Sequence, residues 1–532
     1  MTAESGRATG RRETIRGAVA AGHPETAAAA AEVLADGGNA FDAVVAGLAA
    51  SVVVEPALSS LGGGGFLVAH PVNGRPLVLD FFAQTPARAA PYDQRPLDFR
   101  PVLADFGTTT QEFHVGRAAA AVPGMIPGMC AIQRDLGRLP LARLLEPGIR
   151  LARDGVPLAA LQAHIHTVIA PILLHTAEAR AVFGDPADPA RTQPAGHRLR
   201  LPALADTLDL LGREGERIAR DGPVAEAIAA LCADGGLLTG ADCQRYRVLR
   251  HAPLDRGFRG ARVLTNPPPS SGGALIAFGL ALVEDEPAGE SGPPPDPATL
   301  ARIMRATGLA RDESGLTWGA DDARVEALLA EPMLARGRAA LAGRAHKAGG
   351  TTHLSVLDAE GNAAACTVSN GEGCGHMVPG CGFMLNNMLG EEDLNPAGFF
   401  RWAPDTRVSS MMAPTLAERP DGTVMALGSG GSNRIRTALL QVLCRVLAAD
   451  EPLVDAIAAP RLHVERDHLD LEPGFAAADV RACAEAFPDH RVWPEPSMFY
   501  GGVHAVARQA DGTFEAAGDP RRGGAARLAE PS

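Results

Sequence analysis

The segment from Gly349 to Ser355 holds the most informative chemistry in the sequence. It reads Gly-Gly-Thr-Thr-His-Leu-Ser, and threonines that open an apolar run are by themselves typical of a structural β-strand. A second interpretation follows if the chain is cut between Gly350 and Thr351. Thr351 then carries a free α-amino group, whose ordinary pKa is about 7.7–8.0. That amine lies beside the Thr351 hydroxyl and can act as its general base, as in N-terminal threonine nucleophiles.

Self-cleavage at this bond is chemically reasonable. Gly350 has no side chain, so the Thr351 hydroxyl has room to attack the Gly350 carbonyl and convert the peptide bond into an ester. After cleavage the same hydroxyl can attack the carbonyl of an amide substrate. No separate His/Asp pair is needed, because the neighbouring amine accepts the proton.

Acyl transfer also needs donors for the negatively charged oxygen of the intermediate. The run Gly428–Arg434 reads Gly-Ser-Gly-Gly-Ser-Asn-Arg and offers backbone N–H groups before a helix expected to begin near Arg434. The same pattern is also typical of a generic anion site or of a turn. A second polar run, Glu391-Glu392-Asp393, can bind a cation or an ammonium group, or form a solvated acidic loop.

Other catalytic signatures are missing from the sequence. It contains no P-loop, no G-x-S-x-G elbow and no H-E-x-x-H motif. The run Gly371–Gly375 has the wrong spacing for a dinucleotide fingerprint, and no helical pattern follows it. The eight cysteines form no C-x-x-C pair, so we expect most of them to be small buried side chains. We therefore expect neither a metal ion nor another cofactor.

Composition narrows the class of protein. Of the 532 residues 46% are hydrophobic, which is enough to build sizeable cores and excludes disorder for most of the chain. The net charge of −13 argues against a nucleic-acid-binding surface. The longest apolar run, Ala43–Val54, is too short to span a membrane. The first residues lack the apolar core of an export signal, so a cytoplasmic location is expected.

The order of the expected elements places the threonine near the start of a strand-rich half. Helical patterns dominate the first half, and the only clear linker is Glu284–Pro297. This order predicts two halves that share one core of sheets and helices. Helices are expected over 24–37, 39–53, much of 128–260, 298–343 and 433–449, and strands over 66–68, 77–79, 352–357, 363–368, 462–472 and 502–508.

Several motifs together make the sequence similar to the γ-glutamyltranspeptidase family of N-terminal-nucleophile hydrolases. The combination of Thr-Thr-His-x-Ser and Pro-Pro-Pro-Ser-Ser-Gly-Gly is the most specific part of the resemblance. The matching segments span nearly the whole chain: Gly37–Ala43, Glu55-Pro56, Gly62–Phe66, Val122–Gly124, Pro267–Gly273, Thr351–Ser355, Asn386-Asn387, Met412–Thr415, Gly430–Ser432 and Gly501–His504.

The resemblance implies an α+β fold, a four-layer αββα sandwich formed jointly by two subunits. The subunits would be residues 1–350 and 351–532, released by cleavage between Gly350 and Thr351, and they would remain together as a heterodimer. The resemblance also implies a role for each matching residue. Thr351 is the nucleophile, Ser369 supports it, Gly430 and Gly431 stabilise the oxyanion, and Ser409, Ser410, Glu391 and Asn370 bind substrate.

Ser369 stands where the family has a threonine, and one further departure from the family pattern matters for the substrate. The family typically reads Asp-Phe-Arg-Glu-x-x-Pro where this chain has Asp80-Phe81-Phe82-Ala83-Gln84-Thr85-Pro86. The arginine that clamps the substrate α-carboxylate is therefore Phe82 here, and an aromatic ring cannot replace a bidentate, charged guanidinium. Arg88 is a candidate substitute for that cation. Acyl specificity is expected to differ from that of the family.

The resemblance implies an enzyme that cleaves γ-glutamyl amides such as glutathione through a Thr351 acyl-enzyme. The acyl group would pass to water or to the amine of an amino acid or peptide. Phe82 favours an alternative, an acylase with a changed acyl group, of the glutaryl, cephalosporin or biosynthetic type. A further alternative is an unprocessed, non-catalytic binding protein. No nucleic acid or membrane partner is expected.

Overall fold

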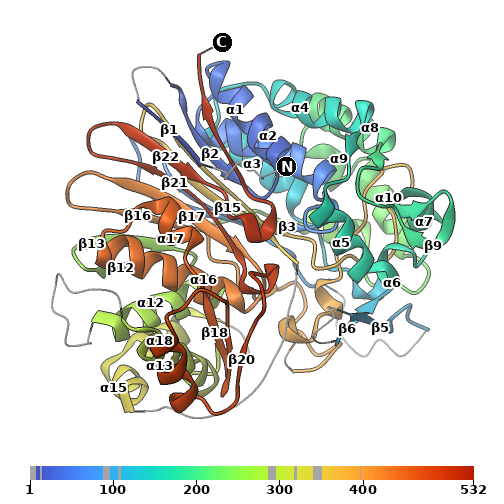
Figure 1. Ribbon diagram of the computed structural model, residues 1–532. Helices are drawn as coiled ribbons and strands as arrows, with labels where there is room; N and C mark the ends of the chain where they lie inside the picture. Colours follow the sequence, from blue (N-terminus) through green and yellow to red (C-terminus); the bar gives the residue numbers. More distant parts are fainter. Residues whose placement is uncertain are drawn as a thin grey trace.

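Two seven-stranded, antiparallel sheets lie face to face at the centre of the molecule (Figure 1). The computed structural model describes residues 7–11, 15–87, 96–105, 110–284, 295–316, 320–339, 350–395 and 397–531. In spatial order, the first sheet contains β1 (Arg7–Arg11), β22 (Thr513–Ala517), β21 (Gly502–Arg508), β17 (Val424–Gly430), β16 (Thr415–Glu418), β13 (Ala261–Thr265) and β12 (Leu254–Phe258). The second contains β11 (Leu249–His251), β4 (Leu77–Phe81), β3 (Gly64–His70), β15 (Ala363–Ser369), β14 (Thr352–Asp358), β2 (Gly17–Ala21) and β23 (Ala525–Ala529).

Helices cover the outer face of each sheet. Those of the first half pack on the second sheet: α1 (Pro24–Ala35), α2 (Ala40–Val54), α3 (Met125–Leu136), α4 (Leu141–Asp154), α8 (Pro202–Glu214), α9 (Arg217–Arg220) and α10 (Pro223–Cys232). The first sheet is covered by α12 (Gly272–Glu284), α13 (Pro297–Glu313), α14 (Asp322–Leu329), α15 (Glu331–Ala339), α16 (Arg434–Leu443), α17 (Leu453–Ala458) and α18 (Ala477–Ala486). The four layers run helix, sheet, sheet, helix (Figure 1), which confirms the predicted α+β sandwich.

Smaller elements lie outside the four layers. They are short helices and the strands of small two- or three-stranded sheets: β5 (Arg100–Asp105), β6 (Thr110–Val115), β7 (Val156–Pro157), α5 (Ala160–Val168), α6 (Ala170–Leu173), α7 (Ala177–Phe183), β8 (Gly184–Asp185), β9 (Asp188–Thr192), β10 (Arg198–Leu199), α11 (Gly240–Arg245), β18 (Leu462–Glu465), β19 (His468–Leu471) and β20 (His490–Val492). None of the helices in the described ranges is long and apolar enough to cross a membrane.

Each main sheet takes strands from both sides of the Gly350–Thr351 bond. β14 begins directly after Thr351 and pairs with β2 of the first half and with β15 of the second. β17 likewise lies between β21 and β16, and β13 of the first half follows β16 in the same sheet. The two halves therefore form one core, as the sequence predicts.

Small side chains let the two sheets approach each other closely. The cluster between the sheets is rich in alanine and valine, among them Ala20, Ala365, Ala426 and Val506. Larger side chains lie on the outer faces, against the helices. This division leaves little free volume between the sheets, so a group added there meets backbone or a neighbouring side chain.

Most of the expected elements are present with small shifts in their bounds. Asn39 caps α2 through a capping box with Asp42, so the Gly37-Gly38 break between the first two helices is confirmed. The expected strand over 462–472 is instead two strands, β18 and β19, joined by a turn in which Arg466 has a φ of +55°. Of the expected linker, residues 285–294 lie outside the described part of the chain.

The four glycines Gly62–Gly65 are explained by close approach of backbone. A Cβ atom on any of them would lie 2.3–2.4 Å from a carbonyl oxygen, and for Gly63 that oxygen belongs to Ser369. Glycine is needed in this run because backbone lies directly against backbone. The run lets the start of β3 lie directly against the end of β15, where the candidate site forms.

We expect Gly428→Ala to destabilise the protein. A methyl group at this position of β17 would lie 2.2 Å from the buried His353 ring, so the free energy of unfolding should fall by about 1–3 kcal/mol. Urea denaturation measures this change. Gly257→Ala in β12 is the matched control, because nothing lies within 4 Å of a methyl group placed there. Equal effects of the two substitutions would contradict the packing argument.

Candidate active site

Two hydroxyl groups converge on the carbonyl oxygen of Gly350. The Thr351 hydroxyl donates to this oxygen at 2.6 Å, and the Ser369 hydroxyl donates to it at 2.7 Å. Ser369 is in place because it ends β15, which pairs with β14 in a register that sets Val368 opposite Thr352. The N–H of Gly371 donates to the Ser369 oxygen at 3.0 Å, which orients that hydroxyl. This arrangement brings two hydroxyl groups to one peptide carbonyl, one of them on the residue that follows it.

The two glycines of the predicted oxyanion site lie on the other side of Thr351. Gly430 is the last residue of β17, and a Cβ atom there would lie 2.1 Å from the Thr351 carbonyl oxygen. Gly431 follows with a φ of +123° and Ser432 with a φ of +50°, so the chain turns sharply here. The run from Gly428 was expected to be a loop, but its first three residues complete β17 because they pair with β21.

The remaining polar residues of the Thr-Thr-His-x-Ser motif build the support beneath Thr351. The His353 ring lies between the sheets, 2.8 Å from both the Thr367 and the Ser355 hydroxyl oxygens. Burial lowers the pKa of His353 well below its ordinary value, so the ring is neutral. Thr352 donates to the carboxylate of Glu55 at 3.0 Å. Within this motif, Thr351 is the residue that lines the cavity described next.

A small cavity opens beside Thr351, and its lining is mostly apolar. Ser410 and Glu391, two of the residues predicted to bind substrate, line it together with Ser369. A Cβ atom on Gly371 would lie 2.2 Å from a Glu391 oxygen, so only glycine leaves room for that carboxylate. No Lys, Arg or His among the described residues lines this cavity, whose members are Phe82, Gly350, Thr351, Ser369, Met388, Glu391, Leu394, Ser410, Met411, Met412, Ser432 and Ile435.

A family model described as Gamma-glutamyltranspeptidase matches residues 26–529. The chain belongs to the gamma-glutamyltranspeptidase family. It is 31% identical to the Acylase ACY 1 proenzyme of Pseudomonas sp. strain V22, over 97% of this chain and 93% of that protein. It is 30% identical to the Glutathione hydrolase proenzyme of Pseudomonas sp. strain A14, over 92% of this chain and 90% of that protein.

The fold of the family is also seen in a solved structure. The cephalosporin acylase from Bacillus halodurans superposes with a TM-score of 0.82 at 22% identity, over 99% of this chain and 97% of that chain. The family consists of N-terminal-nucleophile hydrolases, two-subunit processed enzymes that act on amides. The predicted family and fold class are therefore confirmed.

The Pro-Pro-Pro-Ser-Ser-Gly-Gly motif forms hydrogen bonds with the segment that contains the predicted substrate-binding serines, Ser409 and Ser410. The Ser270 hydroxyl lies 3.0 Å from the Ser410 carbonyl oxygen and 2.7 Å from that of Met412. The Ser409 hydroxyl donates to the Pro269 carbonyl at 2.9 Å. Ser409 and Ser410 also line a second, outer cavity of about 330 Å³. The two cavities adjoin, because both are lined by Ser410, Met411, Leu394 and Ser432.

The asparagines near the site make structural contacts. Asn386 donates to the carbonyls of Gly62 and Ala121 and accepts from two backbone N–H groups. The Asn387 side-chain oxygen accepts from the N–H of Glu372 at 2.8 Å. Asn370 is buried and is not part of the cavity lining. Its contact with substrate stays a prediction.

Phe82 stands where the family typically has an arginine, in the wall of the inner cavity. Its ring is 1% exposed and packs on Phe66, with ring centroids 5.4 Å apart. A nearby cation, Arg407, is engaged elsewhere, because it pairs with Asp80 at 3.2 Å and donates to the carbonyls of Phe82 and Arg247. Arg88, the substitute suggested by the sequence, lies outside the described residues.

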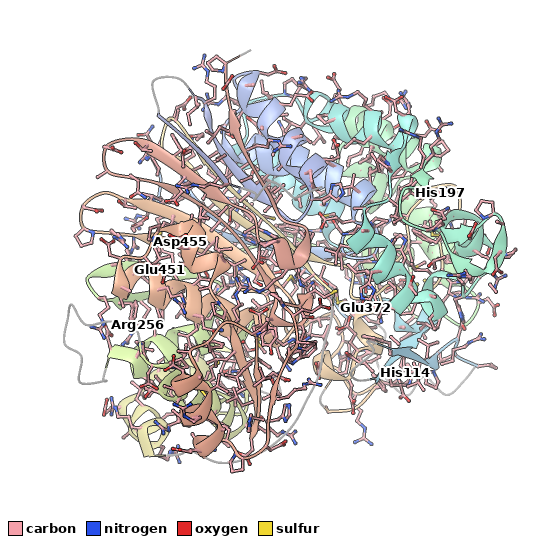
Figure 2. The ribbon with its side chains drawn as sticks, viewed as in Figure 1. His114, His197, Arg256, Glu372, Glu451 and Asp455 are labelled. Atoms are coloured by element: carbon pink, nitrogen blue, oxygen red, sulfur yellow. The ribbon has the colours of Figure 1, made fainter. Side chains whose placement is uncertain are left out.

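Sequence reasoning missed two charged groups that surround Thr351. Glu372 and Arg522 are both buried beside the Gly350–Thr351 peptide. Figure 2 shows Glu372 near the centre of the molecule. Glu372 stands in a glycine-rich run and Arg522 near the end of the chain, so neither falls in a pattern with a known spacing. The sequence offered one signal for Glu372, which is a charged residue between two glycines.

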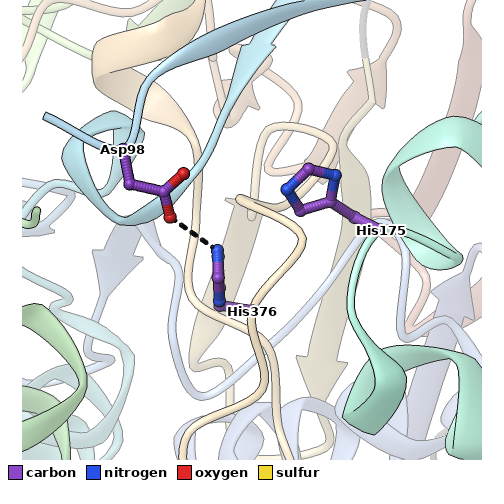
Figure 3. A group of neighbouring side chains, drawn as sticks. All are labelled: Asp98, His175 and His376. Carbon is purple, nitrogen blue, oxygen red and sulfur yellow. Dashed lines mark ion pairs between the residues drawn. The ribbon is translucent and has the colours of Figure 1, made fainter. Parts of the chain in front are cut away.

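Three of the described side chains could hold a metal ion by their chemistry. Asp98, His175 and His376 have ligand atoms within 4.8 Å of one another (Figure 3). The Asp98 carboxylate, however, already accepts from Arg100 at 2.9 Å and from the Arg117 side chain at 2.9 Å, and it pairs with His376 at 2.9 Å. Two guanidinium groups repel a dication. Asp98 is therefore best explained as the acidic partner of Arg100 and Arg117 in an ion-pair network.

We expect Arg407→Gln to be strongly destabilising. Asp80 is fully buried, and loss of the guanidinium would leave its charge with His251, 3.7 Å away, as the remaining side-chain partner. The cost of breaking such a buried pair is about 3–5 kcal/mol. Thermal or urea denaturation measures the loss. Arg138→Gln breaks the exposed pair with Glu360 and should cost less than about 1 kcal/mol. A small effect of Arg407→Gln would mean that water or another cation reaches Asp80.

Proposed function

We propose that this chain is a self-processing amidohydrolase and acyltransferase with Thr351 as its nucleophile. Cleavage between Gly350 and Thr351 would divide it into residues 1–350 and 351–532, which remain together through their shared sheets. The observation that carries the proposal is the convergence of the Thr351 and Ser369 hydroxyls on the Gly350 carbonyl oxygen, at 2.6 and 2.7 Å. The same groups would serve the amide substrate afterwards.

The proposed chemistry is the same in both reactions. In self-cleavage, the Thr351 oxygen bonds to the Gly350 carbonyl carbon, the C–N bond breaks, and the proton of the hydroxyl ends on the Thr351 nitrogen. Water then hydrolyses the ester, leaving a carboxylate on Gly350 and a free amine on Thr351. In turnover, that amine accepts the hydroxyl proton and passes it to the leaving amine. Gly430 and Gly431 are the proposed oxyanion glycines.

We propose that the acyl group is neutral or carries an amine, and lacks the α-carboxylate of a γ-glutamyl group. In the described lining, Phe82, Met388 and Met411 offer apolar surface and Glu391 offers a negative charge. A substrate carboxylate beside Glu391 would be repelled by it, and the described lining of this inner cavity offers no cation. The arginines near the site line the adjoining outer cavity. Glu391 instead suits an ammonium group. The activity is then that of an acylase, a name that one of the relatives carries.

A γ-glutamyl hydrolase or transferase is the second candidate function. Ser409, Ser410 and Glu391 match the family's positions for the α-carboxylate and the α-amino group, and Ser410 and Glu391 line the cavity. A second relative is named as a glutathione hydrolase. For this candidate the serine hydroxyls would have to hold the carboxylate without the arginine that Phe82 replaces. The acceptor would be water, an amino acid or a peptide.

Thr351→Ala tests the nucleophile. The wild-type protein should give two fragments on a denaturing gel, and stepwise degradation of the smaller one should begin Thr-Thr-His-Leu. The Thr351→Ala protein should remain one chain and be inactive, because it lacks the attacking oxygen. The Thr351→Ser protein keeps a hydroxyl at this position and should still be cleaved. An uncut wild-type protein would support the alternative of a non-catalytic binding protein.

A set of four anilides tests the acyl group. γ-Glutamyl anilide carries an α-carboxylate and an amine, glutaryl anilide keeps only the carboxylate, 4-aminobutyryl anilide keeps only the amine, and butyryl anilide has neither. We expect kcat/KM for the two anilides without a carboxylate to exceed that of their carboxylate-bearing partners by at least about 10-fold, or about 1.4 kcal/mol. The mass of the acylated small subunit identifies each acyl-enzyme.

Comparing each carboxylate-bearing anilide with its partner that lacks the carboxylate separates the acylase from the γ-glutamyl hydrolase or transferase. If γ-glutamyl anilide is turned over faster than 4-aminobutyryl anilide, the cavity does bind the carboxylate, and the second candidate replaces the first. Glu391→Gln is the matched variant for the amine. It should reduce the preference for 4-aminobutyryl over butyryl anilide while leaving turnover of butyryl anilide nearly the same, because that substrate has no charge to pair.

A further inference from the structure

The Glu372 carboxylate holds the Gly350 peptide through its N–H group. The N–H of Gly350 donates a hydrogen bond to this carboxylate. The contact is close, because a Cβ atom on residue 350 would lie 2.9 and 3.0 Å from the two carboxylate oxygens. A side chain at residue 350 would meet the Glu372 carboxylate and, at 3.1 Å, the Gly371 carbonyl oxygen. Glu372 or the neighbouring backbone would then have to shift.

Arg522 provides the positive charge for this buried carboxylate. Its guanidinium nitrogen lies 3.5 Å from the Thr351 carbonyl oxygen, the next carbonyl after that of Gly350. A Cβ atom on Gly430 or Gly431 would lie 3.3 Å from the same guanidinium, so the glycine pair makes room for it. Glu372 and Arg522 interact electrostatically, and each favours the charged form of the other. Both side chains are enclosed by the fold.

These contacts fix consecutive groups of the segment that would be cleaved. Glu372 holds the N–H of Gly350, Ser369 holds its carbonyl oxygen, and Arg522 lies at the carbonyl of Thr351. The backbone is thus held before and after the carbon that the Thr351 hydroxyl would attack. A displacement of reacting groups by about 1 Å can cost about 100-fold in rate.

We propose that Glu372 is a positioning residue for self-cleavage, which with Arg522 holds the Gly350 peptide so that its carbonyl faces the Thr351 hydroxyl. This inference rests on the self-processing proposed above and extends it. Glu372 takes no part in bond making or breaking. The bonds that form and break are those already described, and Glu372 sets the orientation of the carbonyl through the Gly350 N–H.

The inference predicts a distinct dependence on pH. Burial raises the pKa of Glu372 to about 7. Its carboxyl therefore becomes neutral as the pH falls through that value and loses its electrostatic attraction to Arg522. Self-cleavage of the wild type should therefore slow as the pH falls from about 8 to about 6. Burial also raises the pKa of Glu55 to about 7, so this second carboxyl needs a control. Among the described residues, Arg434, His504 and Asp519 also interact with Arg522.

The test follows self-cleavage of newly made full-length chain. The precursor is labelled during a short pulse of cell-free synthesis and is then incubated at several pH values. The fraction that remains uncut at each time is measured on a denaturing gel. We expect Glu372→Gln to cleave about 10-fold more slowly than the wild type, because a neutral amide oxygen is a weaker acceptor for the Gly350 N–H than a carboxylate. Its rate should also no longer fall between pH 8 and pH 6.

Glu55→Gln is the matched control. Glu55 is an equally buried carboxylate that interacts with Arg522. It accepts hydrogen bonds from the hydroxyls of Thr352 and Thr26 and not from the Gly350 N–H. The Glu55→Gln precursor should keep the fall in rate at low pH. Arg522→Gln removes the cation but keeps the hydrogen bond from the Gly350 N–H to the Glu372 carboxylate. Because the pKa of Glu372 then rises further, cleavage should slow and its pH dependence should move to higher pH.

The outcomes distinguish this inference from the proposed function. If the wild type cleaves before Thr351 but Glu372→Gln cleaves at a similar rate with the same pH dependence, Glu372 has no positioning role. If the wild type does not cleave, the self-processing itself is wrong. Each variant is also made with Thr351→Ala, and its thermal midpoint shows whether the uncut precursor folds. Should Glu372→Gln not fold, an unshifted pH dependence in Arg522→Gln would overturn the inference.

Discussion

The structure of the site depends on one constraint, the holding of a single peptide group at the point where two neighbouring strands meet. The Gly350 carbonyl oxygen accepts from two hydroxyls, one on its own neighbour and one on Ser369, the last residue of the adjacent strand. Antiparallel pairing of β14 with β15 sets this distance. A shift of one residue in that register would turn Ser369 to the other face of the sheet and separate the two groups.

Room for this arrangement comes from residues that have no side chain. Gly63 lies against the Ser369 carbonyl, Gly430 against the Thr351 carbonyl, and Gly428 against the His353 ring. At each of these positions a methyl group would overlap an atom that is already packed. The glycine-rich character of the family motifs is therefore a packing requirement around a crowded site, in addition to any role in binding an oxyanion.

The surroundings of Thr351 and the acyl pocket differ in how closely they follow the family pattern. The residues around Thr351 keep the family motifs, whereas Phe82 places an aromatic ring, packed on Phe66, where the family typically has a cation. Such an apolar wall can be exchanged without disturbing the contacts on the Gly350 carbonyl. Those contacts are made by hydroxyl groups on β14 and β15 and their flanks, and Phe82 follows β4.

The motifs of the sequence determined the family and pointed to the proposed nucleophile, and the resemblance to that family implied the four-layer fold. Local patterns of helix and strand predicted most of the elements and a core that both halves share. The α1–α2 break and the β14–β15 hairpin are such local features. Only the tertiary structure brought Glu372 and Arg522 to the Gly350 peptide and left Asn370 out of the cavity lining. These contacts join residues far apart in the chain or side chains aimed by loops, and no local pattern encodes the direction of a side chain across a packed interface.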